Sequence, residues 1–216
     1  MIKYLVITSH KYRDRQNNIS LTWGADADLV FYSDETRDEP KTIKTTDDDT
    51  YAGAEHKHVN MVRLLEKEFL DSEWFFFCDD DTFVNTKLLE DFVKGCDPDT
   101  IYGNIISCWP NVCDSVVVGY FSQNENPLHY PSGGAGLLMS RKVLNILSTT
   151  ISHRGSGYGD VALGLAIRDS QIKMQHDDRF HGQPPASCHI LDTKQHFTFH
   201  YIKDLDMMLK LYNQCQ

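Results

Sequence analysis

The chain has 216 residues, of which 41% are hydrophobic, and a formal net charge of −10. This length and composition fit one domain with a substantial core, whereas the acidic balance argues against a nonspecific nucleic-acid binder. No apolar run approaches the roughly 20 residues of a membrane-spanning helix, and residues 2–8 read as a strand and not as a signal peptide. We therefore expect a chain that is soluble as given, whether it is complete or one domain of a longer protein.

Strand-like and helix-like segments alternate along the sequence, as hydrophobic periodicity indicates. In chain order, the expected elements are strands at 2–8 and 28–33, a helix at 53–70, a strand at 73–78, a helix from Asn85 or Thr86 to about Lys94, strands at 101–106 and 115–121, helices at 141–147 and from Asp160 to about Arg168, and a last strand at 196–202. No internal repeat or low-complexity linker interrupts this order. The alternation predicts a single α/β layered domain.

Six cysteines are scattered along the chain without a CxxC pair, which argues against a zinc site. Cys108 and Cys113 are close enough in sequence to form a disulfide. Six free thiols are equally compatible with the sequence, so the redox compartment stays open.

The acidic triplet Asp79–Asp81 follows directly on the apolar run Trp74–Cys78. The run reads as a buried strand, and ligands of open α/β sheets bind at the carboxyl ends of such strands. Neighbouring carboxylates repel one another unless a cation holds them, and in an extended segment Asp79 and Asp81 project to the same side. The pattern predicts a site for an oxygen-preferring divalent cation, Mn²⁺ or Mg²⁺, with Asp80 directed elsewhere, toward a ligand hydroxyl.

A second triplet, Asp47–Asp49, offers an internal comparison. It lies among polar residues, and nothing beside it indicates a buried strand. We interpret it as a solvated loop.

The segment WFFFCDDDTFVN at 74–85 resembles the metal-binding segment of the Fringe-like β1,3-glycosyltransferases, the group that includes Fringe and core-1 galactosyltransferase. Two later segments agree in order and approximate spacing. Gly133–Gly136 resembles the family's GGAG segment beside the donor sugar, and Gly159–Gly164 resembles a segment that has an acidic residue, Asp, Val and a later Gly. The resemblance covers residues 3 to 202, and the combination of motifs is more specific than any one of them.

This resemblance implies that residues 1–216 form one catalytic domain with a GT-A-like (Rossmann-like) fold. Such a fold is a three-layer α/β/α structure with a central mixed, mostly parallel sheet. The resemblance also implies a UDP-sugar donor, Mn²⁺ (or Mg²⁺) and inversion at the anomeric carbon of the sugar.

Inversion needs a base that deprotonates the acceptor hydroxyl, and the resemblance makes Asp160 the candidate. Asp160 follows a glycine-rich loop and is expected at a helix N-terminus, where the helix dipole keeps a carboxylate ionised. The alternative is an N-cap without a catalytic role. The family has a second acidic residue directly before this Asp, whereas this chain has Gly159. Any role of that second acidic residue is therefore absent from this chain or is taken by a residue elsewhere.

The resemblance also suggests where the donor is held. Gly133 and Gly134 are expected to bring backbone N–H groups close to its hydroxyls, with a plain tight turn as the alternative. Arg13 or Arg15, after the first strand, is expected to meet the diphosphate, and Asp34 the uracil or ribose. An ordinary charged loop is the alternative for each of these three.

Two basic residues of the helix at 53–70, Lys57 and Arg63, are either further helpers or its solvated face. A third metal ligand is expected from a histidine late in the chain. His200 is preferred because it lies downstream of Asp160, as the family pattern suggests. His181 and His196 are the alternatives, and Phe180–Gln183 also resembles a Fringe segment in which two histidines flank one residue.

The sequence thus predicts an inverting, metal-dependent glycosyltransferase. It would move a hexose or N-acetylhexosamine from UDP to a hydroxyl of a glycan, glycoprotein or other saccharide, with a β1,3 linkage. The alternatives are a metal-dependent nucleotidyltransferase, which also needs clustered aspartates under a phosphate, and a catalytically idle sugar-binding relative. The compartment stays open: cytoplasm for a complete chain, or the Golgi lumen for a domain excised from a membrane-anchored protein.

Overall fold

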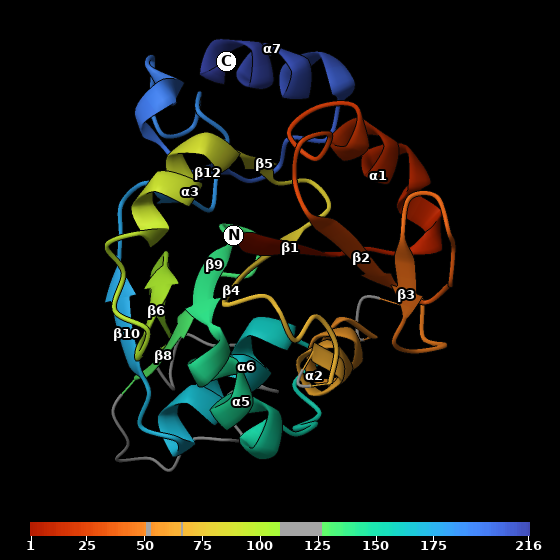
Figure 1. Cartoon of the computed structure of the whole chain (residues 1–216), viewed down its shortest axis with the longest axis vertical. Coiled ribbons are helices and arrows are strands. Elements are labelled where there is room, and N and C mark those ends of the chain that lie inside the picture. Colours follow the sequence, from red (N-terminus) through yellow and green to blue (C-terminus); the bar gives the residue numbers. More distant parts are fainter. Residues whose placement is uncertain (51–52, 66, 109–126) are drawn as a thin grey trace.

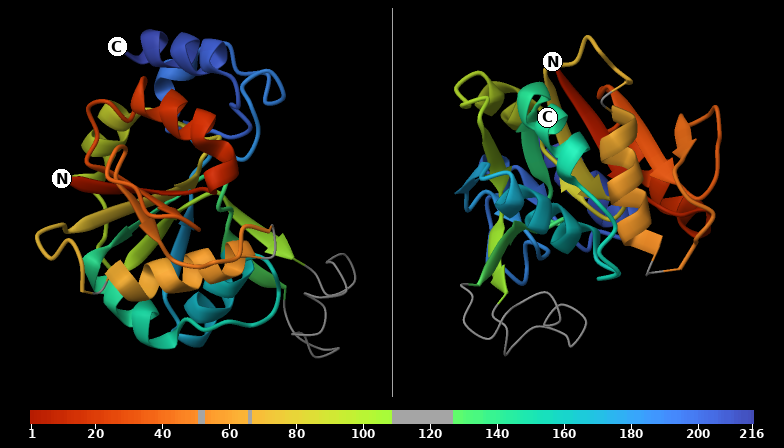
Figure 2. Two further views of the ribbon diagram at one scale, coloured as in Figure 1. Left: turned by 90° about the vertical axis from the view of Figure 1, so that its right-hand side faces the viewer. Right: turned by 90° about the horizontal axis from the view of Figure 1, so that it is seen from below.

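A seven-stranded sheet lies between two layers of helices in the computed structural model (Figure 1 and Figure 2). The structure describes residues 1–50, 53–65, 67–108 and 127–216. In order across the sheet, the strands are β10 (Lys173–His176), β6 (Thr100–Gly103), β9 (Leu137–Ser140), β4 (Trp74–Asp79), β1 (Ile2–Ile7), β2 (Leu29–Ser33) and β3 (Thr42–Lys44). Only β9 runs antiparallel to its neighbours in this sheet of described strands. The expected α/β fold with a mixed, mostly parallel sheet is therefore confirmed.

Smaller sheets and the helices complete the fold. A three-stranded sheet contains β11 (Phe180–His181), β12 (Thr198–Phe199) and β5 (Phe83–Val84), and a two-stranded sheet contains β7 (Ile105–Cys108) and β8 (Leu128–Pro131). The helices are α1 (Arg13–Ser20), α2 (Gly53–Leu65), α3 (Thr86–Val93), α5 (Arg141–Thr150), α6 (Gly159–Asp169) and α7 (Leu205–Cys215), with short 3-10 helices at His10–Tyr12 and Thr193–Gln195. None of the helices in the described ranges combines the length and apolar character that crossing a bilayer requires.

The central strands β1 and β4 owe their place to their apolar sequences. Each residue of β1 is buried, and the aromatic run of β4 is buried between its two ends. Side chains alternate between the faces of a strand, so Phe76 enters the core under α1, α3 and α7 while Phe75 and Phe77 enter the core under α2, α5 and α6. The two helix layers are visible on either side of the sheet in Figure 2.

Two expected strands differ in the structure. The segment 101–106 is divided at Asn104 into β6 and β7, which belong to different sheets, and the Asn104 side chain donates to Phe180 O at 3.1 Å. The segment 196–202 retains only the two-residue strand β12, because Tyr201 has a φ of 61° and the chain then turns so that Ile202 N donates to Asp81 O at 2.8 Å. The expected strand at 115–121 and Cys113 lie outside the described residues.

The helices agree more closely with expectation, although several ends move. The Asn85 side chain caps α3 by accepting from Leu88 N, as predicted. The expected helix at 53–70 is too long, because α2 ends at Leu65 and Phe69 has a positive φ of 51°. The segment after β1, where no helix was expected, forms α1. Its burial pattern gives little signal, because only Gln16 and Ile19 are buried on it.

Candidate active site

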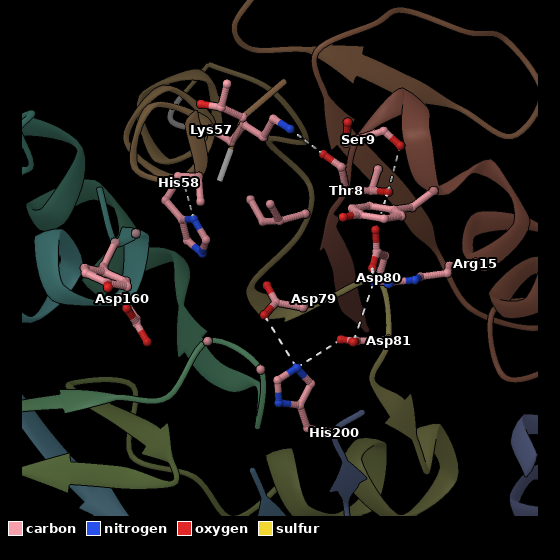
Figure 3. A pocket seen from close by; sticks show the side chains of 18 of the residues that line it. Thr8, Ser9, Arg15, Lys57, His58, Asp79, Asp80, Asp81, Asp160 and His200 are labelled. Atoms are coloured by element: carbon pink, nitrogen blue, oxygen red, sulfur yellow. Dashed lines mark hydrogen bonds and ion pairs between the residues drawn. The ribbon is translucent and has the colours of Figure 1, made fainter. Parts of the chain in front are cut away.

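A cavity of about 390 Å³ opens at the carboxyl ends of β1 and β4 (Figure 3). Strands β1 and β4 are parallel neighbours, so the residues that follow them meet at one edge of the sheet. The antiparallel strand β9 begins at the same edge, and the N-terminus of α6 lies beside it. The lining includes Thr8, Ser9, Arg15, Lys57, His58, Asp79, Asp80, Asp81, Gly133, Gly134, Asp160, His200 and Lys203.

Asp79, Asp81 and His200 form a compact group at the floor of this cavity. One ligand atom from each lies within 4.8 Å of the others. His200 Nε2 is 2.9 Å from Asp81 Oδ1 and 3.8 Å from Asp79 Oδ2 (Figure 3). Burial lowers the pKa of His200, but the hydrogen bond to Asp81 and the charges of both carboxylates outweigh it and raise the pKa.

The chemistry of these three groups can be compared with the cation that the sequence predicts. Carboxylate oxygens bind both Mg²⁺ and Mn²⁺, whereas an imidazole nitrogen is a poor ligand for Mg²⁺, which prefers oxygen. Two carboxylates and one imidazole therefore fit Mn²⁺ better than Mg²⁺. The two negative charges would also offset those of a divalent ion.

Glycine 134 is required by the close approach of the His200 ring. A Cβ atom at Gly134 would lie 2.1 Å from His200 Cε1, far inside van der Waals contact. Its neighbour Gly133 has no such restriction, because a Cβ there would be 3.8 Å from the nearest atoms. The backbone of this loop is also tied to the acidic triplet, since Thr82 Oγ1 donates to Gly134 O at 2.8 Å. The absence of a side chain at Gly134 thus leaves room for the His200 ring beside the carboxylates of Asp79 and Asp81.

The two alternative histidines lie outside the group. His181 Nε2 and His196 Nδ1 are 2.7 Å apart, and the His181 ring stacks on Phe199 at 4.9 Å between centroids. Neither histidine lines the cavity. Burial lowers the pKa of His181 to about 4, and the neighbouring His196 adds to this effect. Of the three histidines considered, only His200 is placed to share a cation with Asp79 and Asp81.

Asp80 points away from its two neighbours toward β1 and α1. It accepts from Thr8 Oγ1 at 2.6 Å and from Arg15 Nη1 at 2.7 Å. Burial raises the pKa of Asp80 to about 6, although the bonds from Thr8 and Arg15 oppose the shift. The two protein partners hold Asp80 in place, and its predicted contact with a ligand hydroxyl stays a prediction.

The two arginines that follow β1 take different positions. Arg15 lines the cavity, and its guanidinium lies 4.0 Å from the centre of the Tyr12 ring. Arg13 is directed to Glu35 and is not part of the cavity lining. The structure therefore brings Arg15, but not Arg13, to the predicted diphosphate side.

Asp34 lies beside the cavity and is held by basic groups. Its side chain is 5% exposed and contacts His10 Nδ1 and, at 3.2 Å, Lys57 Nζ. Burial alone raises the pKa of Asp34, but the bonds from His10 and Ser9 and the Lys57 charge outweigh it and hold the pKa well below its usual range. Lys57 is buried and also donates to Thr8 O at 2.9 Å, so it belongs to the site. Arg63 lies on the exposed face of α2.

Asp160 is the second residue of α6 and faces the cavity from the side opposite Arg15 (Figure 3). The N-cap is Tyr158, so the alternative that Asp160 serves as the N-cap is wrong. Its Oδ1 accepts from Val161 N at 2.9 Å. Burial raises the pKa of Asp160 and outweighs the opposing effects of the His58 ring and of the N–H groups of Gly133 and Val161. The helix N-terminus therefore does not keep this carboxylate at its usual pKa.

Glu55 is a buried acidic residue near the site that the sequence analysis missed. It is 3% exposed and accepts from Gly155 N at 3.0 Å, from Gly157 N at 2.8 Å, from Ser156 Oγ at 2.9 Å and from Arg154 N. These bonds fix the loop that leads to Asp160. A signal was available, because Glu55 occupies the helical face of Val59 and Val62, where an apolar residue is expected.

The rim of the cavity contains a further contact that was not anticipated. Lys11 Nζ lies 2.6 Å from Asp49 Oδ2 and joins the segment after β1 to the loop before α2. The triplet Asp47–Asp49 is a loop, as expected, and the Asp47 side chain is 93% exposed. Asp49, however, lines the cavity.

Comparison with known proteins relates this geometry to one family. The family model described as Fringe-like matches residues 2–209. The β1,3-galactosyltransferase brn of Drosophila melanogaster is 22% identical over 190 residues, which cover 84% of this chain and 58% of that protein. The chain thus spans less than two thirds of the length of this relative.

Two solved structures share the fold. The galactosyltransferase LgtC, in complex with donor and acceptor sugar analogues, matches with a TM-score of 0.53 and 12% identity over 99% of this chain and 95% of LgtC. A glycosyltransferase involved in the glycosylation of the major capsid of PBCV-1 matches with a TM-score of 0.50 and 13% identity over 97% of this chain and 98% of that chain. At these identities the similarity concerns the fold, which is that of GT-A glycosyltransferases.

Proposed function

Because the chain belongs to the Fringe-like family of glycosyltransferases, we propose that it transfers a hexose or N-acetylhexosamine from a UDP-sugar to an acceptor hydroxyl, with inversion and a β1,3 linkage. The observation that carries this proposal is the group of Asp79, Asp81 and His200 within 4.8 Å at the end of β4. The linkage rests on the similarity to the Drosophila β1,3-galactosyltransferase. The acceptor is a glycan, a glycoprotein or another saccharide.

Asp79, Asp81 and His200 are the residues that would hold Mn²⁺. When bound there, the cation offsets the negative charge that the diphosphate gains as the bond to the sugar breaks. Arg15 lies at the other side of the triplet and supplies a fixed positive charge close to Asp80. Asp80 and Asp81 are buried, which reduces the screening of their charges by water.

Asp160 is the proposed base. The acceptor oxygen forms a bond to the anomeric carbon, UDP leaves with the electrons of the broken bond, and the proton of the acceptor hydroxyl passes to an Asp160 carboxylate oxygen. A raised pKa makes a carboxylate a stronger base near neutral pH, which supports this role. The hydrogen bonds between Glu55 and the loop that precedes Asp160 keep the Asp160 carboxylate in a fixed place.

The test is a screen of UDP-sugars with saccharide acceptors, with and without Mn²⁺. We expect Mn²⁺-dependent release of UDP together with a glycoside whose linkage is read by NMR. Release of pyrophosphate and transfer of the nucleotidyl group would indicate a nucleotidyltransferase instead. The variants Asp79→Asn and Asp81→Asn should abolish turnover, and Asp47→Asn serves as the exposed control. Wild-type protein that neither binds UDP with Mn²⁺ nor turns over any UDP-sugar would overturn the proposal.

A further inference from the structure

The space above Gly159 is filled by the imidazole of His58. Gly159 is the first residue of α6, directly before Asp160. A Cβ atom at Gly159 would lie 2.0 Å from His58 Nδ1 and 2.3 Å from His58 Cγ. No side chain can occupy position 159 while the His58 ring is in its place. The two positions, which are about 100 residues apart in sequence, are therefore sterically linked.

The orientation of the His58 ring is fixed from α2. The ring is 9% exposed, and its Nδ1 lies 2.9 Å from the carbonyl oxygen of Ala54. A carbonyl oxygen only accepts hydrogen bonds, so Nδ1 carries the hydrogen and, in the neutral ring, Nε2 is an acceptor. No hydrogen bond or ion pair joins Nε2 to any residue that the structure describes. The atom is directed into the cavity (Figure 3).

The part of the cavity that Nε2 faces lies between two groups with proposed roles. Asp79 lies on one side of the His58 ring and Asp160 on the other (Figure 3). If the diphosphate is held at Asp79, Asp81 and His200, and the base is Asp160, the transferred sugar occupies the space between them. A sugar presents hydroxyl groups, which donate to an unpartnered ring nitrogen.

We propose that His58 Nε2 accepts a hydrogen bond from a hydroxyl of the transferred sugar, and that position 159 is glycine because this ring occupies the space of a side chain. The inference rests on the proposed function and extends it by naming a residue for recognition of the donor sugar. His58 touches the substrate in this account, whereas Gly159 acts through His58.

Two substitutions separate this role from simple packing. In His58→Gln the side-chain amide nitrogen or oxygen reaches the place of Nε2, and the bond to Ala54 is lost. In His58→Asn the side chain reaches only the place of Nδ1, so the bond to Ala54 is kept and the group facing the cavity is lost. The dissociation constants of UDP and of the UDP-sugar that supports turnover are measured by calorimetry with Mn²⁺. Thermal unfolding of each variant shows whether the fold is retained.

We expect His58→Asn to weaken binding of the UDP-sugar about 10-fold, as loss of one hydrogen bond to a buried group does, while binding of UDP without a sugar is unchanged. His58→Gln is expected to bind the UDP-sugar within about 3-fold of wild type. If the His58 ring served only packing and the bond to Ala54, His58→Gln would weaken UDP-sugar binding more than His58→Asn. Equal weakening of UDP and UDP-sugar binding, or unchanged UDP-sugar binding in His58→Asn, would overturn the inference.

The link to Gly159 gives an independent measurement. Gly159→Ala must displace the His58 ring and should weaken UDP-sugar binding about as much as His58→Asn does. In a His58→Ala background the same substitution should have little further effect, because its Cβ then has room. Additive effects would contradict the steric link. Failure of the proposed function has a different signature: wild-type protein would not distinguish UDP-sugars from UDP and would show no turnover, and both proposals would then fall.

Discussion

Replacing Glu55 by glutamine tests whether a buried carboxylate holds the loop in front of Asp160. The substitution keeps the shape of the side chain and removes its charge. One carboxylate oxygen accepts from Gly155 N and Arg154 N, and the other from Gly157 N and Ser156 Oγ. In the amide, one of these pairs faces an NH₂ group, which cannot accept.

The expected cost follows from these contacts. Hydrogen bonds to a charged group contribute about 1.5–3 kcal/mol each, and an unsatisfied buried donor costs about 1–3 kcal/mol. The Ser156 hydroxyl can turn toward Tyr158 O, 3.0 Å away, so mainly the Gly157 N–H loses its acceptor. We therefore expect a loss of about 3 kcal/mol in the free energy of unfolding. For a chain of this size that loss lowers Tm by roughly 6–12 °C.

Thermal and urea unfolding followed by circular dichroism at neutral pH measure this loss. Asp47→Asn, at a side chain that is 93% exposed, is the matched control and should stay within about 0.5 kcal/mol of wild type. Because the loop leads to Asp160, Glu55→Gln should also lower the rate of transfer. A Tm within about 2 °C of wild type would refute the idea that Glu55 anchors the loop.

The pH dependence of the free energy of unfolding, compared between wild type and Glu55→Gln, provides a second test. Burial raises the pKa of Glu55, but the bonds from residues 154–157 outweigh it, and the pKa lies below its usual value of 4.5. A lowered pKa means that the folded state binds the proton less well than the unfolded state. The stability that Glu55 contributes is thus fully present above about pH 4.5 and is lost as the pH falls through the folded pKa. The difference between wild type and Glu55→Gln should narrow over that range.

Three further outcomes follow from the structure, two at the site and one at His181. Gly134→Ala, whose Cβ would lie 2.1 Å from His200, should displace that ring and weaken Mn²⁺ binding about 10-fold or more; unchanged affinity by electron paramagnetic resonance would argue against His200 as a ligand. Asp160→Asn should slow transfer by roughly 10²–10⁴-fold with little change in UDP affinity, and wild-type turnover would exclude it as the base. The pKa of His181 is lowered from 6.5 to about 4. As the pH falls from about 6.5 to about 4, the unfolded state therefore binds a proton before the folded state does, and the free energy of unfolding decreases. His181→Phe should remove this part of the pH dependence in equilibrium unfolding.

Local sequence was sufficient to predict the central strand β4 and most of the helices of this protein. The aromatic run that ends in Asp79–Asp81 predicts a buried strand with carboxylates at its carboxyl end, because such a run can only be stable between two apolar layers. Asn85 predicts the start of α3 through a cap that involves residues only three positions apart. Helical spacing predicts α2 and α6. By contrast, α1 was missed because few of its side chains are buried, so it lacks an apolar stripe.

Contacts between distant positions were decided only by the tertiary structure. The sequence could not choose Arg15 over Arg13, since both follow the same strand and the helix turn alone directs one to Asp80 and the other to Glu35. It named His200 only through a family pattern, and the fold brings that ring across Gly134 to carboxylates about 120 positions away. Glu55 meets Ser156 across 101 positions. Local propensity carries no information on such pairs, because they form only when the helices pack on the sheet.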